Sequence, residues 1–267
     1  KVIKVGECIE GAPTVKNWEE LKLYTGANAA NMVTGEDRKE AFWCNWNQLE
    51  INYGDNVDFQ LRQEQVMLCA QTTDFLYTHF TPTDTRYVKG TRPELEKYVY
   101  EIIDGCSTDR EKVITLMRFT RDLYKKVNGR QLFYGGTEEE LIKKGEQLCE
   151  CLGRLMVAMC EIIGIPGRIV MHVIGGHITS EVYFEGKWAY IDPRCGLYYL
   201  WPDGRFASVW EIWNNPRLLA AQNQEVKRDI SPLWTWEQRL LTNEKKYFHP
   251  REINGFQNYS LMDSSKY

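Results

Sequence analysis

Three of the eight cysteines in this chain of 267 residues lie within twelve positions of one another, at Cys149, Cys151 and Cys160. The reactive form of a cysteine is its thiolate, and an imidazole nearby can take up the thiol proton. Two of the four histidines, His172 and His177, follow these cysteines within a short stretch. With a carboxylate that orients one imidazole, such residues could catalyse acyl transfer through a thioester.

A carboxylate of this kind is predicted at Asp192. Residues 177–192 are typical of a hairpin, with the alternating strands "HITSEVYF" and "KWAYID" joined by the turn residues "EG". With a two-residue turn, Thr179 faces Asp192, and His177 shares the face of Thr179 because side chains alternate along a strand. His177 and Asp192 are then diagonal neighbours with β-carbons about 6 to 8 Å apart, which allows a hydrogen bond between imidazole and carboxylate.

The opposite face of this hairpin is apolar and is expected to pack on the core. It carries Ile178, Val182, Phe184, Ala189 and Ile191. A slip of one residue in the register would send the two polar side chains to opposite faces. His172 lies among apolar residues of the preceding strand, "RIVMHVI", where we expect a buried structural histidine.

The three cysteines lie on a predicted helix that Gly145 approaches and Gly164 ends. Its apolar residues recur at the i, i+3, i+4, i+7 spacing of one buried face. Cys149 falls near the first turn, where unpaired N–H groups and the helix dipole favour a thiolate. Cys151 points elsewhere, since it lies about 200° further around the helix. Cys160 lies about three turns deeper and is predicted to be a packing residue.

Other segments complete the predicted architecture. Two amphipathic segments, "RPELEKYVYEIIDGC" and "STDREKVITLMRFTRDLYKKV", precede this helix and three strands follow it, which predicts an α+β domain over residues 89–267. Residues 1–88 contain stretches in which polar and apolar residues alternate, separated by turn signals. This pattern predicts a strand-containing accessory region. The C-terminal segment is rich in tryptophan, and we favour a packing layer over an extended groove for Trp201, Trp210, Trp213, Trp234 and Trp236.

Composition and charge exclude several classes of function. The net charge is −4 and basic residues are interleaved with acidic ones, so no nucleic-acid partner is expected. No apolar run reaches the roughly 18 residues of a membrane span. The remaining cysteines lack CxxC spacing, so no structural zinc, other metal or cofactor is predicted. The chain begins with Lys1 rather than Met, so we expect that upstream residues have been removed, and the sequence predicts neither a compartment nor an oligomeric state.

The spacing of the chemical residues resembles the core of the transglutaminase-like superfamily, a papain-related fold that includes transglutaminases and peptide N-glycanases. In that pattern a Cys opens a helix, GIPAR follows fifteen residues on, a His precedes Glu-Val by four residues, and a Trp precedes Asp-Pro by four. Here "GIPGR" begins fifteen residues after Cys149, "EV" begins four after His177, and "DP" begins four after Trp188. All three spacings fit the pattern.

The resemblance covers about residues 95–195 and implies an α+β domain in which a helix-borne cysteine packs on an antiparallel sheet. It implies Cys149, His177 and Asp192 as a catalytic triad, and it favours Cys149 over Cys151. Cys149 would attack an amide or ester carbonyl. His177 would hold the thiolate as an ion pair and protonate the leaving amine, while Asp192 orients the imidazole.

Two departures from the family pattern bear on the substrate cleft. Gln147 stands where the family usually has a glycine, and Thr179 stands where it usually has an aromatic residue two positions after the histidine. We expect both side chains to touch the cleft, and Gln147 is a candidate oxyanion donor beside the backbone N–H of Cys149. Trp188 is predicted to be a core residue or a cleft wall rather than a catalytic group.

The expected function is cysteine-dependent acyl transfer on a peptide or protein, with water resolving the acyl-enzyme as in a peptidase or amidase. One alternative is a transglutaminase, in which an amine resolves it, and another is a scaffold that binds peptide or glycan without turnover. Thr179 favours water, because a small polar residue there removes one apolar wall of an amine channel. Peptide N-glycanase chemistry is not favoured, because the sequence lacks the zinc-binding CxxC pairs of that branch.

Overall fold

The computed structural model describes residue 40 and residues 66–68, 72–78, 83–85, 87–127, 136–242, 246–249 and 251–257. Its helices are α5 (Thr73–Tyr77), α6 (Pro93–Ile102), α7 (Asp109–Asp122), α8 (Glu138–Lys144), α9 (Cys149–Ile162), α10 (Val209–Asn214), α11 (Gln224–Asp229) and α12 (Trp236–Thr242), with short 3-10 helices η2 (Leu123–Lys126) and η3 (Pro216–Leu219). Its strands are β1 (Val66–Met67), β2 (Gly167–His172), β3 (His177–Phe184), β4 (Lys187–Ile191) and β5 (Asn254–Gln257).

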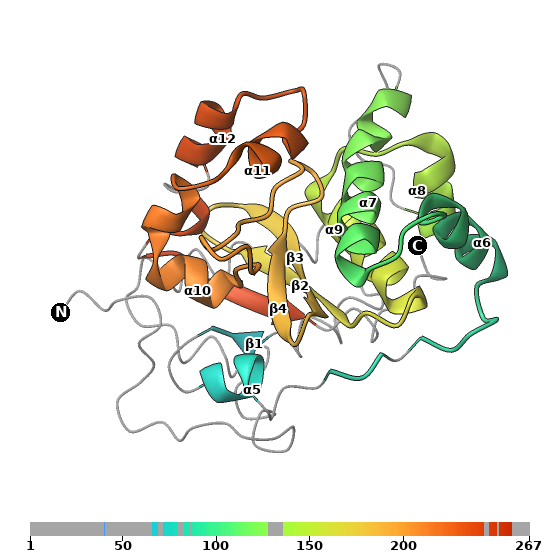
Figure 1. Ribbon diagram of the computed structural model, residues 1–267, viewed down its shortest axis with the longest axis horizontal. Helices are drawn as coiled ribbons and strands as arrows, with labels where there is room; N and C mark the ends of the chain where they lie inside the picture. The colour runs from blue at the N-terminus through green and yellow to red at the C-terminus, as the bar shows by residue number, and fades with distance from the viewer. Residues whose placement is uncertain are drawn as a thin grey trace.

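These strands form one sheet in the order β1-β5-β2-β3-β4, and every neighbouring pair is antiparallel. Strands β2, β3 and β4 follow α9 directly in the chain, and α6 to α9 gather on one side of them (Figure 1). This arrangement confirms the predicted α+β class and the predicted order of a helix followed by three strands.

The hairpin β3–β4 has the predicted register. Val182 faces Ala189 across it, and the turn consists of Glu185 and Gly186. Both turn residues have positive φ, 52° and 75°, as a two-residue turn that matches the twist of the strands requires. The predicted apolar face is also confirmed, since Val182, Phe184, Ala189 and Ile191 are buried in the core and Ile178 packs against it.

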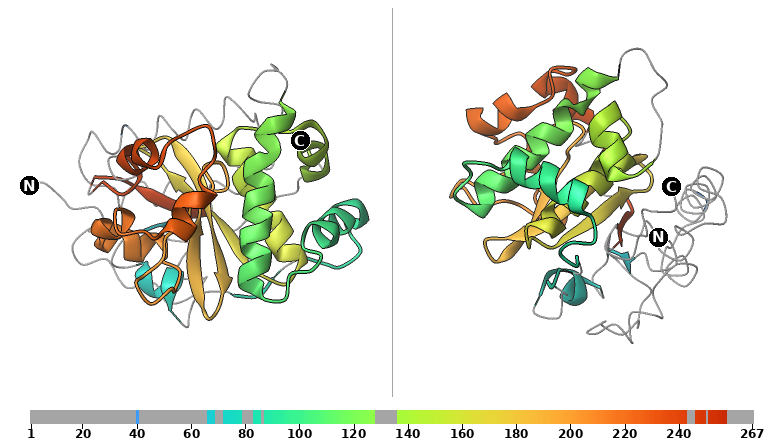
Figure 2. Two further views of the ribbon diagram at one scale, coloured as in Figure 1. Left: turned by 45° about the horizontal axis from the view of Figure 1, so that its top comes forward. Right: turned by 90° about the vertical axis from the view of Figure 1, so that its right-hand side faces the viewer.

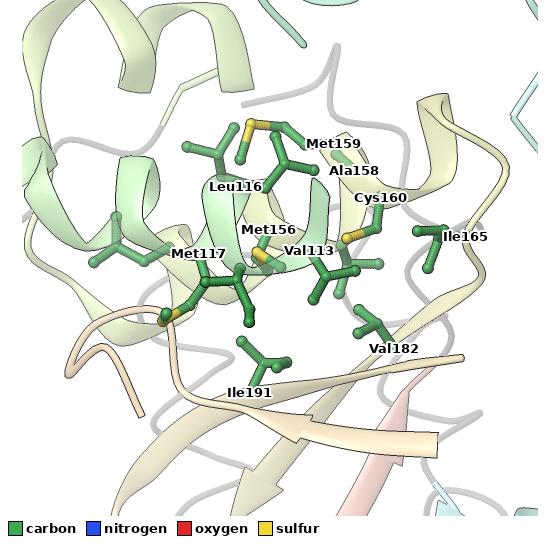
Figure 3. Close-up of a cluster of buried hydrophobic side chains, with 14 of the residues drawn as sticks. Val113, Leu116, Met117, Met156, Ala158, Met159, Cys160, Ile165, Val182 and Ile191 are labelled. Carbon is green, nitrogen blue, oxygen red and sulfur yellow. The ribbon is translucent and has the colours of Figure 1, made fainter. Parts of the chain in front are cut away.

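One hydrophobic core lies between α7, α9 and the sheet (Figure 3). It includes Val113, Leu116 and Met117 of α7, Met156, Ala158, Met159 and Cys160 of α9, and Val182 and Ile191 of the sheet. Cys160 has no exposed surface, which confirms that it is a packing residue. The core therefore holds α9 rigidly against the strands that carry His177 and Asp192.

A second core covers the other face of the sheet, so that α7 and α10 lie on opposite sides of the strands (Figure 2). It joins Val170, Tyr190 and Phe256 of the sheet with Phe75 and Leu76 of α5, Val209 and Ile212 of α10, and Leu218 and Leu219 of η3. Trp201, Trp210, Trp213 and Trp236 are partly buried and pack against this core, as expected of a packing layer. Polar side chains on this face of the sheet are therefore enclosed as well.

Helix α9 begins at the cysteine. Cys149 is its first residue, and the preceding Leu148 provides no side-chain cap for the helix N-terminus. One turn further on, Gly153 faces β3, since a Cβ atom added there would lie 3.4 Å from the Thr179 carbonyl oxygen. The helix ends before Gly164, whose φ of 82° stops it at the predicted position.

The region that precedes α6 contributes to the same sheet. Val66 of β1 faces Phe256 of β5, which ties this part of residues 1–88 to the C-terminal strand. Within residues 1–65 the structure describes residue 40 alone, so the strands expected there lie outside the described residues. The domain boundary expected near residue 88 stays a prediction. Among the helices that the structure describes, none has the length and apolar character needed to cross a membrane.

Candidate active site

His177 and Asp192 meet at the end of the hairpin opposite its turn. The Nε2 atom of His177 lies 2.9 Å from Oδ2 of Asp192, and both residues are almost completely buried. The second carboxylate oxygen accepts hydrogen bonds from the backbone N–H groups of Arg194 at 3.1 Å and Cys195 at 3.0 Å. The turn that follows β4 therefore fixes the carboxylate, and the carboxylate fixes the imidazole.

Asp192 is ionised in this setting. Burial alone would raise its pKa, but the charge and hydrogen bond of His177 and the charge of Arg239 outweigh burial and hold the pKa of Asp192 well below its usual range. Nη2 of Arg239 lies 3.7 Å from Oδ2 of Asp192. A buried carboxylate held as an anion is what stabilises a protonated imidazole beside it.

Cys149 faces the other side of the imidazole. Nε2 of His177 is engaged with Asp192, so Nδ1 is the ring nitrogen left for the thiol of Cys149, whose pKa His177 lowers through its charge and hydrogen bonding. Burial raises the pKa of the thiol, but the charge and hydrogen bond of His177, the backbone N–H of Ile178 and the charge of Arg194 together lower it. The thiol at the N-terminus of α9 is thus prepared to lose its proton.

The histidine is shifted in the complementary direction. Burial lowers the pKa of His177, but the charges of Asp192 and Cys149 and their hydrogen bonds raise it well above its usual value. A lowered thiol pKa and a raised imidazole pKa both favour the thiolate–imidazolium pair, the reactive form of a cysteine nucleophile.

The other buried cysteines lack this environment. Burial raises the pKa of the thiols of Cys151 and Cys160 far above the usual value, and it raises the pKa of Cys195 to about 11. Cys149 is also partly exposed, whereas these three are buried. Of these four thiols only Cys149 combines access with a lowered pKa.

The three atoms of His177, Asp192 and Cys195 that could hold a metal ion lie within 4.8 Å of one another. Two of these residues are already joined by a hydrogen bond, and the guanidinium of Arg239 lies 3.7 Å from the same carboxylate oxygen. A cation would therefore compete with a proton and sit beside a positive charge. These three residues are therefore better suited to orienting a histidine base than to binding a metal ion.

Tyr247 was not predicted as part of this site. Its ring is stacked on that of His177, with centroids 4.6 Å apart and planes inclined by 23°, and its side chain is buried. A Cβ atom on Gly175 would lie 2.7 Å from the Tyr247 ring, so only glycine permits this approach. Arg239 hydrogen-bonds Tyr247, which links the stacked ring to the cation beside Asp192.

The predicted structural role of His172 is confirmed. It is fully buried, with Nδ1 2.8 Å from Oδ1 of Asn254 and Nε2 3.0 Å from the hydroxyl of Thr179. Because the Asn254 oxygen can only accept, Nδ1 donates and Nε2 accepts from Thr179. Burial and the nearby charge of His177 lower the pKa of His172 to about 3, so the ring is neutral.

Of the other two cleft candidates, Thr179 lies elsewhere, and Trp188 is a buried core residue, which was one of its two predicted positions. Thr179 is fully buried and bonded to His172, because the second core covers that face of the sheet, so it forms no wall of an open channel. Trp188 is 5% exposed and lies under the guanidinium of Arg168, whose Cζ is 4.0 Å from the ring centroid. Trp188 is therefore a packing partner of Arg168 and not a neighbour of the hydrogen-bonded pair.

Gln147 lies two residues before the cysteine and is partly exposed. Its backbone N–H and that of Leu148 donate to Oε1 of Glu146, at 2.7 and 3.0 Å, and Glu146 is fully buried. This carboxylate fixes the path by which the chain enters α9. Gln147 remains a candidate donor to an oxyanion at the helix N-terminus.

Comparison with known families agrees with this geometry. Residues 96–193 match the family model of the transglutaminase-like superfamily, a stretch that runs from α6 to the residues just after β4 and contains Cys149, His177 and Asp192. This part of the chain is a transglutaminase-like domain, as its spacings predicted, and domains of this superfamily generally carry out cysteine-based acyl transfer. No curated protein and no solved structure matches the chain.

Proposed function

We propose that the transglutaminase-like domain of this chain hydrolyses an amide or peptide bond through a thioester on Cys149. One observation carries the proposal: Nε2 of His177 lies 2.9 Å from the buried carboxylate of Asp192, and the same imidazole lowers the pKa of the thiol at the start of α9. His177 and Asp192 then have the roles of base and orienting group. Both side chains are buried, so neither acts as a solvated charge on the protein surface.

The reaction proceeds in two halves. The thiolate of Cys149 attacks the carbonyl carbon, and the oxyanion that forms is stabilised by the backbone N–H of Cys149, with Gln147 as the proposed second donor. The imidazolium of His177 gives its proton to the leaving amine as the carbon–nitrogen bond breaks. Water then attacks the thioester carbonyl, returns one proton to His177 and releases the thiolate, so that amide and water become acid and amine.

Water is the proposed second substrate because hydrolysis of the thioester needs only solvent access and a base beside it. Cys149 is partly exposed, so solvent can reach the thioester. Transfer to an amine also requires an apolar channel that excludes water. In the sequence, Thr179 favoured water over an amine as the second substrate. Its side chain is buried, so it does not affect which of the two reaches the thioester.

The test separates thioester formation from its resolution. The wild-type chain, Cys149→Ala and the matched control Cys151→Ala are incubated with glutamine-containing peptides and with casein, with and without a fluorescent primary amine. We expect free acid as the main product for the wild type and Cys151→Ala, and no product for Cys149→Ala. If the amine-linked peptide were the main product, the proposed hydrolysis would be wrong and the domain would be a transglutaminase. Product formation by Cys149→Ala would reject the thioester mechanism.

A further inference from the structure

Arg194 lies in the turn that follows β4, beside the proposed catalytic residues. Its backbone N–H donates to the Asp192 carboxylate at 3.1 Å, so the residue is held one hydrogen bond from the carboxylate that orients His177. Its side chain is partly exposed, and the guanidinium carbon lies 5.6 Å from the centroid of the Trp234 ring. A cation over an aromatic face keeps its charge while its position is defined.

The guanidinium of Arg194 makes no ion pair with any carboxylate of the described residues. Another partly buried arginine does, since Arg110 donates two hydrogen bonds to Glu185 at 2.8 and 2.6 Å. Arg168 likewise donates to Glu181 at 2.9 and 2.6 Å. An arginine that is partly removed from water and lacks a carboxylate partner is prepared to bind one from outside.

The neighbouring Arg239 is different although it shares the same aromatic ring. Its guanidinium carbon lies 4.9 Å from the Trp234 ring centroid, but it is buried and its Nη2 lies 3.7 Å from Asp192. Its charge is therefore balanced inside the protein. Arg194 presents the uncompensated charge of this pair at the surface.

The charge of Arg194 also reaches the nucleophile. The backbone N–H of Arg194 lies 3.1 Å from the carboxylate that is 2.9 Å from His177, and the Arg194 charge is one of the causes that lower the pKa of the Cys149 thiol. A group held by Arg194 would therefore lie close to the carbonyl that Cys149 attacks. This proximity makes the residue relevant to the choice of substrate rather than to folding alone.

We infer that Arg194, supported by Trp234, binds a carboxylate of the substrate beside the scissile acyl bond, so that the domain acts on acidic peptides. This inference rests on the proposed function of Cys149. The planar guanidinium can hold the two oxygens of a carboxylate with parallel hydrogen bonds, which a neutral amide cannot match. The carboxylate is either an aspartate or glutamate side chain or a free C-terminus close to the bond that is cleaved.

The test uses two small electrophiles that alkylate Cys149 and differ in charge. Iodoacetate carries a carboxylate and iodoacetamide carries a neutral amide, and the ratio of their rate constants at one pH cancels any change in thiolate fraction. We expect Arg194→Gln to lower the ratio of iodoacetate to iodoacetamide rates about tenfold, because a charge-assisted hydrogen bond is lost. Arg194→Lys keeps the charge without the planar fork, and its ratio should fall between the two.

The matched control is Arg217→Gln, an exposed arginine of η3. It removes one positive charge elsewhere and should leave the ratio at the wild-type value. An unchanged ratio in Arg194→Gln would overturn the inference, and so would an equal fall of the ratio in Arg217→Gln. Equal slowing of both reagents in Arg194→Gln would overturn it too, because Arg194 would then only activate the thiol. Failure of iodoacetamide to label Cys149 in the wild type would instead reject the proposed function, whatever the ratio.

Discussion

The ring of Tyr247 lies flat against the ring of His177, 4.6 Å between centroids, and a residue far along the chain thereby covers the imidazole. The same ring lies 5.1 Å from that of His172, and Arg239 hydrogen-bonds it. The imidazole is thus held by a carboxylate at one edge, a thiol at the other and an aromatic face above. Such enclosure fixes ring orientation and keeps water from the bond between imidazole and carboxylate.

Replacing Tyr247 should separate the effect of its ring from that of its hydroxyl. Tyr247→Phe keeps the stacked face and loses only the hydrogen bond with Arg239, so we expect less than about a threefold change in turnover. Tyr247→Leu loses the planar face, so the imidazole gains freedom and turnover should fall about tenfold or more. The pH dependence of Cys149 alkylation should shift only in Tyr247→Leu, and equal effects of the two variants would show that the stacking has no positioning role.

The ion pair of Cys149 and His177 predicts an unusual pH dependence for alkylation. Because the pKa of the thiol is lowered and that of the imidazole is raised, the thiolate–imidazolium pair exists above the first pKa and below the second. The alkylation rate with iodoacetamide should therefore stay high as the pH falls below the usual thiol pKa of about 8.5.

The control for this profile is His177→Gln. Without the imidazole, burial raises the pKa of the Cys149 thiol, so the midpoint of the rate should move to higher pH. Cys151→Ala should keep the wild-type profile, since that thiol is buried and its pKa is raised. First labelling of Cys151, measured by mass spectrometry, would contradict the assignment of the nucleophile.

Asp192→Asn should preserve the fold and remove most of the activity. An asparagine can still accept hydrogen bonds from the N–H groups of Arg194 and Cys195, which the carboxylate now accepts at 3.1 and 3.0 Å. The negative charge beside His177 is lost, and so is the main cause that raises the imidazole pKa. Turnover should fall at least about a hundredfold. The fold should persist with a lower unfolding temperature, because the buried charges of His177 and Arg239 lose their counter-charge. Turnover within threefold of wild type would contradict the role of the charge.

The sequence was sufficient for the hairpin and the pair it carries. The turn residues Glu185 and Gly186 set the register, and the period of two then places His177 and Asp192 on one face without further information. The start of α9 was also predictable, because Gly145 and the apolar periodicity mark it and place Cys149 in the first turn. Each of these depends on neighbours in the chain.

The rest of the site depends on tertiary contacts that no local pattern encodes. Tyr247 reaches His177, and Arg239 reaches Asp192, because β5 returns to the sheet and brings the preceding segment over its face. The same covering layer explains Thr179, whose strand position was predicted correctly but whose exposure was not. Alternation along a strand shows which side chains share a face, and it cannot show whether that face is open.

His172 predicts that the fold loses stability in mild acid. Its pKa is about 3 in the folded chain and about 6.5 when unfolded, so below pH 6.5 the unfolded state binds a proton that the folded state does not. The free energy of unfolding should then fall by roughly 1 kcal/mol for each pH unit between about pH 6 and pH 4. His177 does not oppose this fall, because its raised pKa adds stability that is fully present below pH 6.5 and is lost only as the pH rises through the folded value.

The variant His172→Gln isolates this contribution. Glutamine retains hydrogen-bonding capacity toward Asn254 and Thr179 but cannot be protonated, so the variant should be less stable at neutral pH and lose less stability on acidification. The lowered pKa of Asp192 also stabilises the fold, but this stability is lost only below the unfolded pKa near 3.8. It therefore does not change the slope of the unfolding free energy between about pH 6 and pH 4. Urea unfolding at several pH values within this range gives the two slopes, and parallel slopes would show that the buried neutral imidazole is not the cause of the acid sensitivity.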